Sequence, residues 1–492
     1  MLPVHLKPGL TNPMERLPQG LRWRKWPLHP ELWWGILAFV LGLLLVWKPE
    51  VPVGFAAVIA AFAFLLRVPE AGLGLALFTG PLAPLENELW RPPLNSAQIF
   101  LGLALLAWGW RGLAQRDLRL PRWGWDWAYG LFLSYALISL SWASSWEDGL
   151  PEWIKWAQIG LVAIMVLTAS PRIQRVLLGI ALTSGAIQAG VGIWQAFLRG
   201  TGPEHFLLPG LPFYRAYGTF QQPNPFAGMM GLIAPVALGL AFGLLGHPQR
   251  SAREIGLGLG ALSVGGLALL ALIVSWSRGA WLGAAIAMGT LIGMLPARSR
   301  WGFAALAALV LTGAFLWAAG WIPAPIRDRL AGAMEELQIT DVRGVEVNEA
   351  NFAIIERLAH WQAAVEMIRA HPWRGVGFGN YAAAYPAYAL IRWPHPLGHA
   401  HNIYLNMAAE TGLIGLLLYL LLWVVIGAQT WRAWRRNTGW RRGLAAGVMA
   451  AWMHLHVHQF FDNLYVANLP LLIALYGAWV ELLVREPARE AP

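Results

Sequence analysis

The chain has 492 residues, of which 57% are hydrophobic and 13% are charged, and its net charge at pH 7 is +10. Soluble domains carry about 25% charged residues, so this composition excludes an ordinary soluble protein and indicates an integral membrane protein. The lack of cysteine excludes disulfides, thiol chemistry and thiolate metal sites. The positive charge does not indicate nucleic-acid binding, because basic residues collect in the cytoplasmic loops of membrane proteins.

Apolar segments predict the order of elements along the chain, since a bilayer core requires about 20 apolar residues per helix. The predicted spans are 33–47, 51–66, 71–86, 95–110, 126–142, 152–169, 174–197, 225–246, 255–275, 279–297, 302–321, 403–428, 443–461 and 466–484. We therefore expect an all-α polytopic membrane protein with about 12–14 transmembrane helices. The predicted organisation is a cytoplasmic tail (1–32), a transmembrane region (33–321) with an outer loop (198–224), a long outer loop (322–402), further transmembrane helices (403–484) and a cytoplasmic tail (485–492).

Lysine and arginine set the predicted orientation, because they are enriched in cytoplasmic loops. They gather in every second loop, with the densest groups in 111–122 and 432–442. Loops on the other side carry few basic residues until the long one. Both termini are therefore predicted to be cytoplasmic, and the loops 198–224, 322–402 and 462–465 to lie on the outer face.

The long outer loop is the most unusual stretch, because long loops between elements are uncommon unless they have a function. Residues 350–370 have helical periodicity, and His371-Pro372 ends that helix. Gly375, Gly377 and Gly379 predict a turn-rich passage. Residues 326–349 are expected to form a lid or short surface helices. The loop closes with His399-Ala400-His401-Asn402, directly before the next span.

Three arginines near outer span ends are candidate binding residues: Arg215, Arg278 and Arg357. Arginine is energetically costly near a bilayer core, which makes such positions functional candidates. A guanidinium group donates two parallel hydrogen bonds and stays charged, so phosphate is its natural ligand. The alternative for each arginine is a snorkelling side chain or a carboxylate partner.

Histidines are the other candidates for chemistry. A neutral imidazole of His399 or His401 could accept a proton from a hydroxyl or could bind a metal ion, and the alternative is a capping or structural role. The outer face shows no obvious acidic metal triad. His454 and His458 share a helix face, with Asp462 one turn further on, and structural hydrogen bonding is favoured there over metal binding. No phosphate-binding loop or nucleotide-binding fingerprint is present on the cytoplasmic side.

Several of these motifs together resemble the O-antigen ligase and O-antigen polymerase superfamily. They are Ser275 to Trp281, Arg357-Leu358-Ala359-His360-Trp361, Pro372 to Tyr381, His399 to Leu405 and Glu410 to Gly415, and the passage from Arg215 to Asn224 also fits. The resemblance implies a GT-C-like, metal-independent glycosyltransferase of the bacterial inner membrane. Such an enzyme moves a glycan from undecaprenyl diphosphate to an acceptor hydroxyl, which is a lipid A–core sugar in ligases.

The resemblance also implies roles for individual residues. Arg215 and Arg278 match the arginines that bind the diphosphate, and His401 matches the general base, with His399 as its helper. Further substrate contacts are expected from Arg357, Asn224, Tyr381 and Asn402. No cofactor and no metal ion are expected. The alternatives are a polysaccharide polymerase of the same superfamily, a bicarbonate or small-solute transporter, and a non-catalytic membrane scaffold.

Overall fold

The computed structural model describes residues 60, 62–118, 120–208, 212–246, 249–296, 299–324, 326–327, 341–347 and 351–486. The chain divides into two units, residues 1–63 and 64–492, and helices α3 (Pro69–Thr79) to α18 (Pro470–Arg485) all belong to the second unit. The predicted N-terminal tail, the first span, most of the second span, most of the segment 326–349 and almost all of the C-terminal tail lie outside the described residues. Within the described part the chain is helical, with one isolated β-bridge between Leu207 and Tyr214.

The first half of the unit contains six described helices, and side-chain caps mark the starts of three of them. The six helices are α3 (Pro69–Thr79), α4 (Ala83–Leu89), α5 (Ser96–Ala114), α6 (Asp126–Ser139), α7 (Trp146–Thr168) and α8 (Pro171–Phe197). Asn95 and Gln98 form a capping box at the start of α5, and the side chains of Ser145 and Ser170 cap α7 and α8.

One predicted span differs from the structure. Residues 71–86 do not form a continuous helix, because α3 ends at Thr79 and a short 3₁₀ turn, Gly80–Leu82, separates it from α4. Pro81 and Pro84 lie in this passage. Proline has no backbone N–H and clashes with the preceding turn, so the α-helical hydrogen bonds stop here. The sequence showed the apolar composition but not the interruption.

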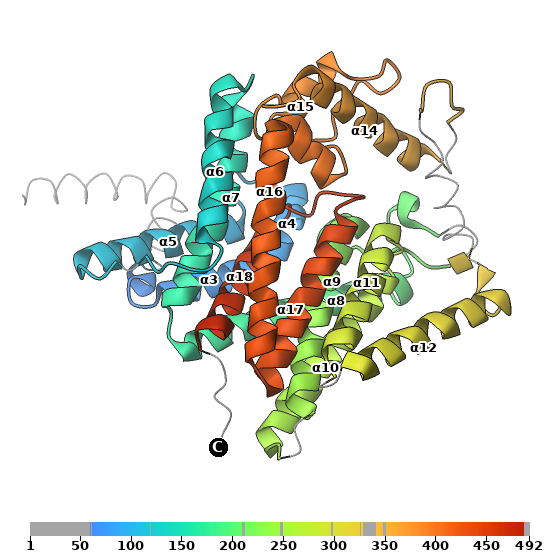
Figure 1. Cartoon of the computed structure of the whole chain (residues 1–492). Coiled ribbons are helices and arrows are strands. Elements are labelled where there is room, and N and C mark those ends of the chain that lie inside the picture. The colour runs from blue at the N-terminus through green and yellow to red at the C-terminus, as the bar shows by residue number, and fades with distance from the viewer. Residues whose placement is uncertain are drawn as a thin grey trace, which may run out of the picture. The chain divides into compact units, whose positions relative to one another are not determined.

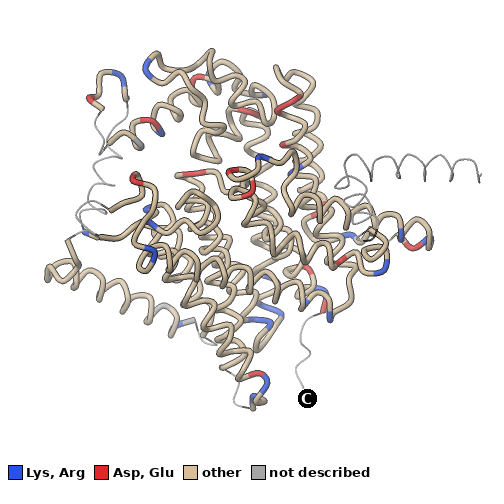
Figure 2. The backbone as a smooth tube through the Cα atoms, turned by 180° about the vertical axis from the view of Figure 1, so that it is seen from behind, with Lys and Arg blue, Asp and Glu red and all other residues tan. Residues whose placement is uncertain are grey.

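The second half of the unit contains α9 (Pro223–Leu245), α10 (Ala252–Ile273), α11 (Arg278–Met294), α12 (Ser299–Ala318), α14 (Phe352–Ala370), α15 (Tyr381–Ala384), α16 (Ile403–Arg436), α17 (Gly439–His458) and α18 (Pro470–Arg485). The prediction of an all-α polytopic membrane protein is confirmed, since seven described helices are long and apolar enough to cross a membrane. Figure 2 shows the charged residues gathered mainly at helix ends and in connecting segments.

Helices α9 and α17 form the centre of the packing. Their backbones approach closely at glycines: a Cβ on Gly239 would lie 2.3 Å from the carbonyl oxygen of Gly443, and one on Gly447 would lie 2.5 Å from that of Pro235. Small residues allow such close packing between membrane helices. α17 also packs against α11, and α9 against α10. This arrangement brings the C-terminal end of α17 next to the turn between α10 and α11.

The long loop leads directly into helix α16. This helix packs against α6, α17, α18 and α14 (Figure 1). Its helical conformation is broken at Gly412, where φ is +68° and ψ is −177°. At the break, Val376 donates its N–H to the carbonyl of Ala409, and Leu413 donates its N–H to the carbonyl of Pro372. The loop therefore supplies hydrogen-bond partners that the interrupted helix lacks.

Candidate functional site

The turns that carry Arg215 and Arg278 lie side by side. Arg215 donates from Nε to the carbonyl oxygen of Ser275 over 2.9 Å, and the N–H of Ala216 donates to the carbonyl of Val274 over 2.9 Å. Arg278 opens α11 only three residues after Ser275. Both arginines are half-buried. The structure thus brings together two cations that are 63 residues apart in the chain.

The turn between α10 and α11 has an unusual backbone. Trp276 has φ +54°, in the left-handed region that bulky residues rarely adopt, at a cost of roughly 1–3 kcal/mol. Local hydrogen bonds hold it: the hydroxyl of Ser275 donates to the carbonyl of Leu272 over 2.6 Å, and the N–H of Ser277 donates to the Ser275 hydroxyl over 3.2 Å. The strained conformation directs the chain from the end of one helix into Arg278.

The same turn rests on the end of α17. The hydroxyl of Ser277 lies 3.5 Å from Nε2 of His458, and a Cβ on Gly279 would lie 3.1 Å from both His458 and Phe461. His458 is buried. Asp462 follows Phe461 directly in the chain, so the arginine turn and Asp462 are held at the same end of the packed helices.

The two histidines that close the long loop meet Asp462. Nδ1 of His401 lies 3.3 Å from Oδ1 of Asp462, and Nε2 of His399 lies 3.9 Å from the same oxygen. The two imidazole rings are 4.3 Å apart between centroids. His401 has φ +51°, another left-handed backbone in a non-glycine residue. The carboxylate is buried, while each histidine side chain is about one-fifth exposed.

The hydrogen bonds assign the proton positions on both rings. An ionised carboxylate only accepts, so Nδ1 of His401 carries the hydrogen that it shares with Asp462, and Nε2 of His401 carries the lone pair. The backbone N–H of His401 donates to Nδ1 of His399 over 3.0 Å. In neutral His399 the proton is therefore on Nε2. Within this cluster, Nε2 of His401 is therefore the lone-pair nitrogen that does not already accept a hydrogen bond.

The electrostatic environment supports a neutral His399 beside an ionised Asp462. Burial, together with the neighbouring His401, lowers the pKa of His399 to about 4, against a smaller opposing effect of Asp462. Burial acts to raise the pKa of Asp462, but the hydrogen bond from His401 and the charges of His401, His399 and Arg357 outweigh it, and the net pKa is well below its ordinary value. Asp462 is therefore a carboxylate at any pH where the site would work.

Helix α14 of the long loop lies over this cluster. The His360 ring is 6.1 Å from that of His401 and stacks on Tyr385 at 4.5 Å. Burial and the nearby His401 lower the pKa of His360 to about 4. Tyr381 donates its hydroxyl to the carbonyl of His360 over 3.0 Å. The charge of Arg357, on the same helix, acts on Asp462.

A buried carboxylate fixes the loop below α14. Glu410 accepts from the N–H of Gly379 over 3.0 Å and from the N–H of Tyr381 over 3.2 Å. One turn earlier on α16, Asn406 accepts from the N–H of Ala400 over 3.0 Å, the residue between the two histidines. The break in α16, the glycine-rich passage and the histidine pair are therefore one hydrogen-bonded unit.

The predicted site residues are only partly brought together. Asn402 caps α16, with its side chain accepting from the N–H groups of Tyr404 and Leu405. Tyr381 is 0% exposed, so its side chain offers no surface to a substrate here. Asn224 lies half-buried in the first turn of α9, and within the described residues no hydrogen bond or ring contact joins it to the histidines.

Two residues of the candidate site, Asp462 and His360, were not among the predicted site residues. The sequence placed Asp462 one turn beyond His458, in a group weighed as a metal site, but did not indicate that it would bind His401, because 61 residues separate them. His360 lies in a motif of the resemblance yet was assigned no role. Asp462 stands just past the end of a predicted span and His360 in the middle of the predicted helix 350–370, and neither position marks the residue as a neighbour of His401.

His399, His401 and Asp462 could also be read as a metal site, since one ligand atom from each lies within 4.8 Å of the others. This combination of two histidines and an acidic residue was not anticipated. However, a neutral imidazole has one lone-pair nitrogen, and His399 already uses Nδ1 to accept the His401 N–H. Binding a metal through Nε2 would break that contact. The arrangement fits a hydrogen-bonded histidine–carboxylate pair better than a metal centre.

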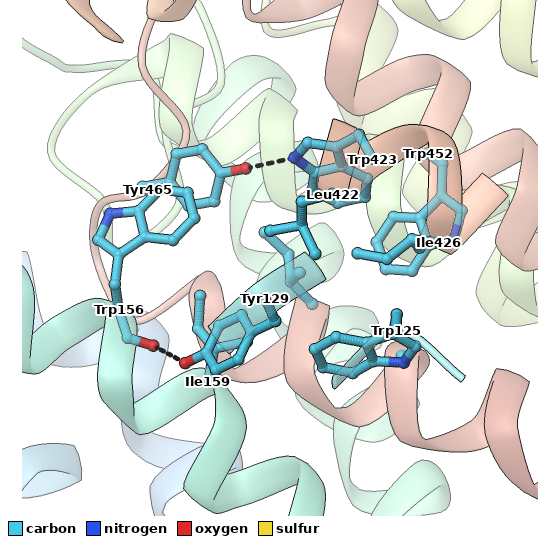
Figure 3. A pocket seen from close by; sticks show the side chains of 11 residues that line it. Trp125, Tyr129, Trp156, Ile159, Leu422, Trp423, Ile426, Trp452 and Tyr465 are labelled. Atoms are coloured by element: carbon cyan, nitrogen blue, oxygen red, sulfur yellow. Dashed lines mark hydrogen bonds between the residues drawn. The ribbon is translucent and has the colours of Figure 1, made fainter. Parts of the chain in front are cut away.

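A separate small cavity lies among α6, α7, α16, α17 and α18 (Figure 3). Its lining is almost wholly aromatic and aliphatic and includes Trp125, Trp423 and Trp452. Trp423 donates from Nε1 to the hydroxyl of Tyr465 over 3.2 Å, and Tyr129 donates its hydroxyl to the carbonyl of Trp156 over 2.5 Å. With no histidine or carboxylate in its lining, this cavity has no group suited to acid–base chemistry.

Comparison with known families identifies the central part of the chain. Residues 263–420 match the family model described as O-Antigen ligase. The matched segment runs from within α10 into α16. It includes Arg278, Arg357, His399 and His401, and it excludes Arg215 and Asp462. No curated protein matches the chain.

Proposed function

Because residues 263–420 match the O-antigen ligase family model, we propose that the chain is a membrane glycosyltransferase of the ligase type. In this proposal the donor is a glycan on undecaprenyl diphosphate, and the acceptor is a sugar hydroxyl of lipid A–core on the outer face of the bacterial inner membrane. The observation that carries the proposal is the hydrogen bond between Asp462 and Nδ1 of His401, because it leaves Nε2 of His401 as a basic nitrogen. Asp462 itself directly follows Phe461, against which the turn with Arg278 packs.

The proposed reaction starts at His401. Its Nε2 accepts the proton of the acceptor hydroxyl as the hydroxyl oxygen attacks the anomeric carbon of the donor sugar. The bond between that carbon and the diphosphate oxygen breaks, and the diphosphate leaves with the electron pair. A positioned base contributes about 10²–10⁴-fold to such a step. Asp462 stabilises the imidazolium that forms, without itself being protonated.

Arg215 and Arg278 are proposed to hold the diphosphate. Negative charge grows on the leaving oxygen as the glycosidic bond breaks, and preorganised cations stabilise that charge more than the ground state. The bond from Arg215 to the Ser275 carbonyl orients one guanidinium relative to the turn that carries the other. Arg357, whose charge acts on Asp462, is proposed to add further positive charge at this site. Tyr381 and Asn402 act as positioning residues in this proposal, since both are buried.

The proposal is tested by transfer with purified protein, using an undecaprenyl-diphosphate glycan as donor and lipid A–core as acceptor. Appearance of the glycan on the core is expected. Growth of the donor-linked chain instead would identify a polymerase. Folded protein that does neither, or that carries a solute across reconstituted vesicles after Arg278→Ala and His401→Ala, would contradict the proposal.

Single substitutions test the roles proposed for His401 and Arg278. His401→Ala should lower the rate about 10²–10⁴-fold, whereas His395→Ala, which removes an exposed histidine of the same loop, should leave it unchanged. Arg278→Lys should also be slow, because an ammonium group lacks the two-pronged geometry that phosphate requires. Full activity of Arg278→Lys would rule out the bidentate role.

A further inference from the structure

Two tryptophans flank Arg278 and form one surface. Trp276 precedes it by two residues and Trp281 follows it by three, and their rings lie 5.4 Å apart at an interplanar angle of 48°. Trp281 donates from Nε1 to the carbonyl of Ile273 over 2.9 Å, which fixes its ring over the last turn of α10. Both tryptophans are half-buried, and Ile273 beside them is 46% exposed. An apolar surface therefore begins at the arginine turn and continues onto a membrane-spanning helix.

Interfacial anchoring alone does not explain this pair. Tryptophans are common at membrane interfaces because their rings are amphipathic, and that role needs no particular backbone conformation. Trp90 is such a residue: it is 72% exposed and has an ordinary φ of −127°. Trp276 instead has φ +54° and is held there by hydrogen bonds of its own turn. Strained backbone that the surroundings maintain is found chiefly at functional sites.

We propose that the rings of Trp276 and Trp281 form the subsite for the first isoprene units of the lipid carrier. The inference rests on the proposed function, which places the carrier's diphosphate on Arg215 and Arg278. The hydrocarbon chain is covalently joined to that diphosphate, so it must leave the arginine turn across a neighbouring apolar surface on its way into the bilayer. Rigid aromatic rings provide a large apolar contact area at this point. The pair would therefore select donors by their lipid rather than by their glycan.

The test compares donors that carry the same glycan on undecaprenyl diphosphate and on methyl diphosphate, which has no isoprene unit. In Trp276→Ala, KM for the undecaprenyl donor should rise about tenfold, as expected for the loss of one aromatic contact. KM for the methyl donor should not change. The control Trp90→Ala should alter neither. An equal effect on both donors would mean that the ring contacts the glycan or only supports the fold, and it would overturn the inference.

A second variant separates the ring from the backbone. Trp276→Gly accepts the left-handed conformation without strain but has no side chain, so it should behave like Trp276→Ala. If Trp276→Gly keeps the wild-type KM, the backbone conformation is what matters and the inference fails. Trp276→Phe should restore most of the affinity for the undecaprenyl donor.

A direct measurement of ligand binding tests the lipid subsite separately from the proposed glycan transfer. Calorimetry on the full-length protein measures Kd for inorganic pyrophosphate and for geranyl diphosphate. Trp276→Ala should weaken geranyl diphosphate about tenfold and leave pyrophosphate unchanged, whereas Arg278→Ala should weaken both. This result would support the subsite even if no glycan transfer were detected. Equal binding of geranyl diphosphate by wild type and Trp276→Ala would overturn it.

Discussion

At His401, the proposed chemistry depends on which ring nitrogen carries the proton. The contact between Asp462 and Nδ1 fixes the form in which Nε2 is the base. Asp462→Asn keeps the shape of the side chain, but its amide nitrogen can donate to Nδ1 and favour the other form, and no carboxylate remains to stabilise the imidazolium. We expect the turnover rate to fall by about 10²-fold or more, with a smaller change in KM.

The matched control is Asp341→Asn, because Asp341 is an exposed carboxylate of the long loop that carries His401. This variant should keep the wild-type rate. Thermal melting of both variants shows whether a loss of rate reflects misfolding. A folded Asp462→Asn protein with an unchanged rate would contradict the role of Asp462 as the residue that orients the base.

His360 makes the stability of the loop sensitive to pH. Its pKa is lowered from 6.5 to about 4, first because it is buried and second because His401 is near. Between pH 4 and 6.5 the unfolded chain therefore binds more protons than the folded chain, and the free energy of unfolding decreases as the pH falls through this window. The melting temperature of the detergent-solubilised protein should fall between pH 7.5 and 5.

His360→Gln removes this titration and should make the fall in melting temperature smaller by a few degrees. His395→Gln changes an exposed histidine of the same loop and should melt with the wild-type pH dependence. If His360→Gln and the wild type lose stability in parallel over this range, buried His360 is not the group responsible.

At the scale of elements, the break in α16 is the feature on which the loop depends. Gly412 has φ +68°, and a Cβ there would lie 2.2 Å from the carbonyl carbon of Trp373. Gly412→Ala would therefore push residues 372–377 away from α16 and also strain its own backbone. We expect a loss of several degrees in melting temperature and faster hydrogen exchange in the loop. Gly427→Ala, at an open position of the same helix, should be neutral or slightly stabilising.

The helices themselves were largely predictable, and their interruptions were not. Apolar length and periodicity predicted the positions of α5 to α12 and of α14, and their bounds agree within a few residues. The break at Gly412 was not predicted, because a glycine in an apolar run is compatible with a continuous helix. Its cause lies in the loop that contacts it. The turn Gly80–Leu82 was not predicted either, because apolar length alone does not show where prolines interrupt a span.

At the scale of the molecule, the site is assembled from segments distant in sequence. Arg215 precedes α9, Arg278 opens α11, His401 precedes α16, and Asp462 follows α17. Sequence patterns proposed the arginines and histidines one by one, from their places in the loops between apolar segments. They did not show that Arg215 would bind the Ser275 carbonyl or that Asp462 would bind His401. Those contacts depend on the close packing of α17 against α9 and α11, which composition does not specify.

The predicted orientation decides whether this assembly can meet its substrates, because the proposed donor and acceptor both lie on the outer face. The absence of cysteine allows single-cysteine variants to be labelled without background. Ile391→Cys lies in the long loop and replaces a fully exposed residue, and Arg436→Cys lies at the C-terminal end of α16. In intact spheroplasts a membrane-impermeant maleimide should label Ile391→Cys at once and Arg436→Cys only after permeabilisation. The reverse pattern would place the histidines and arginines on the cytoplasmic side, out of reach of an outer-face glycan, and the proposed function would have to be abandoned together with the orientation.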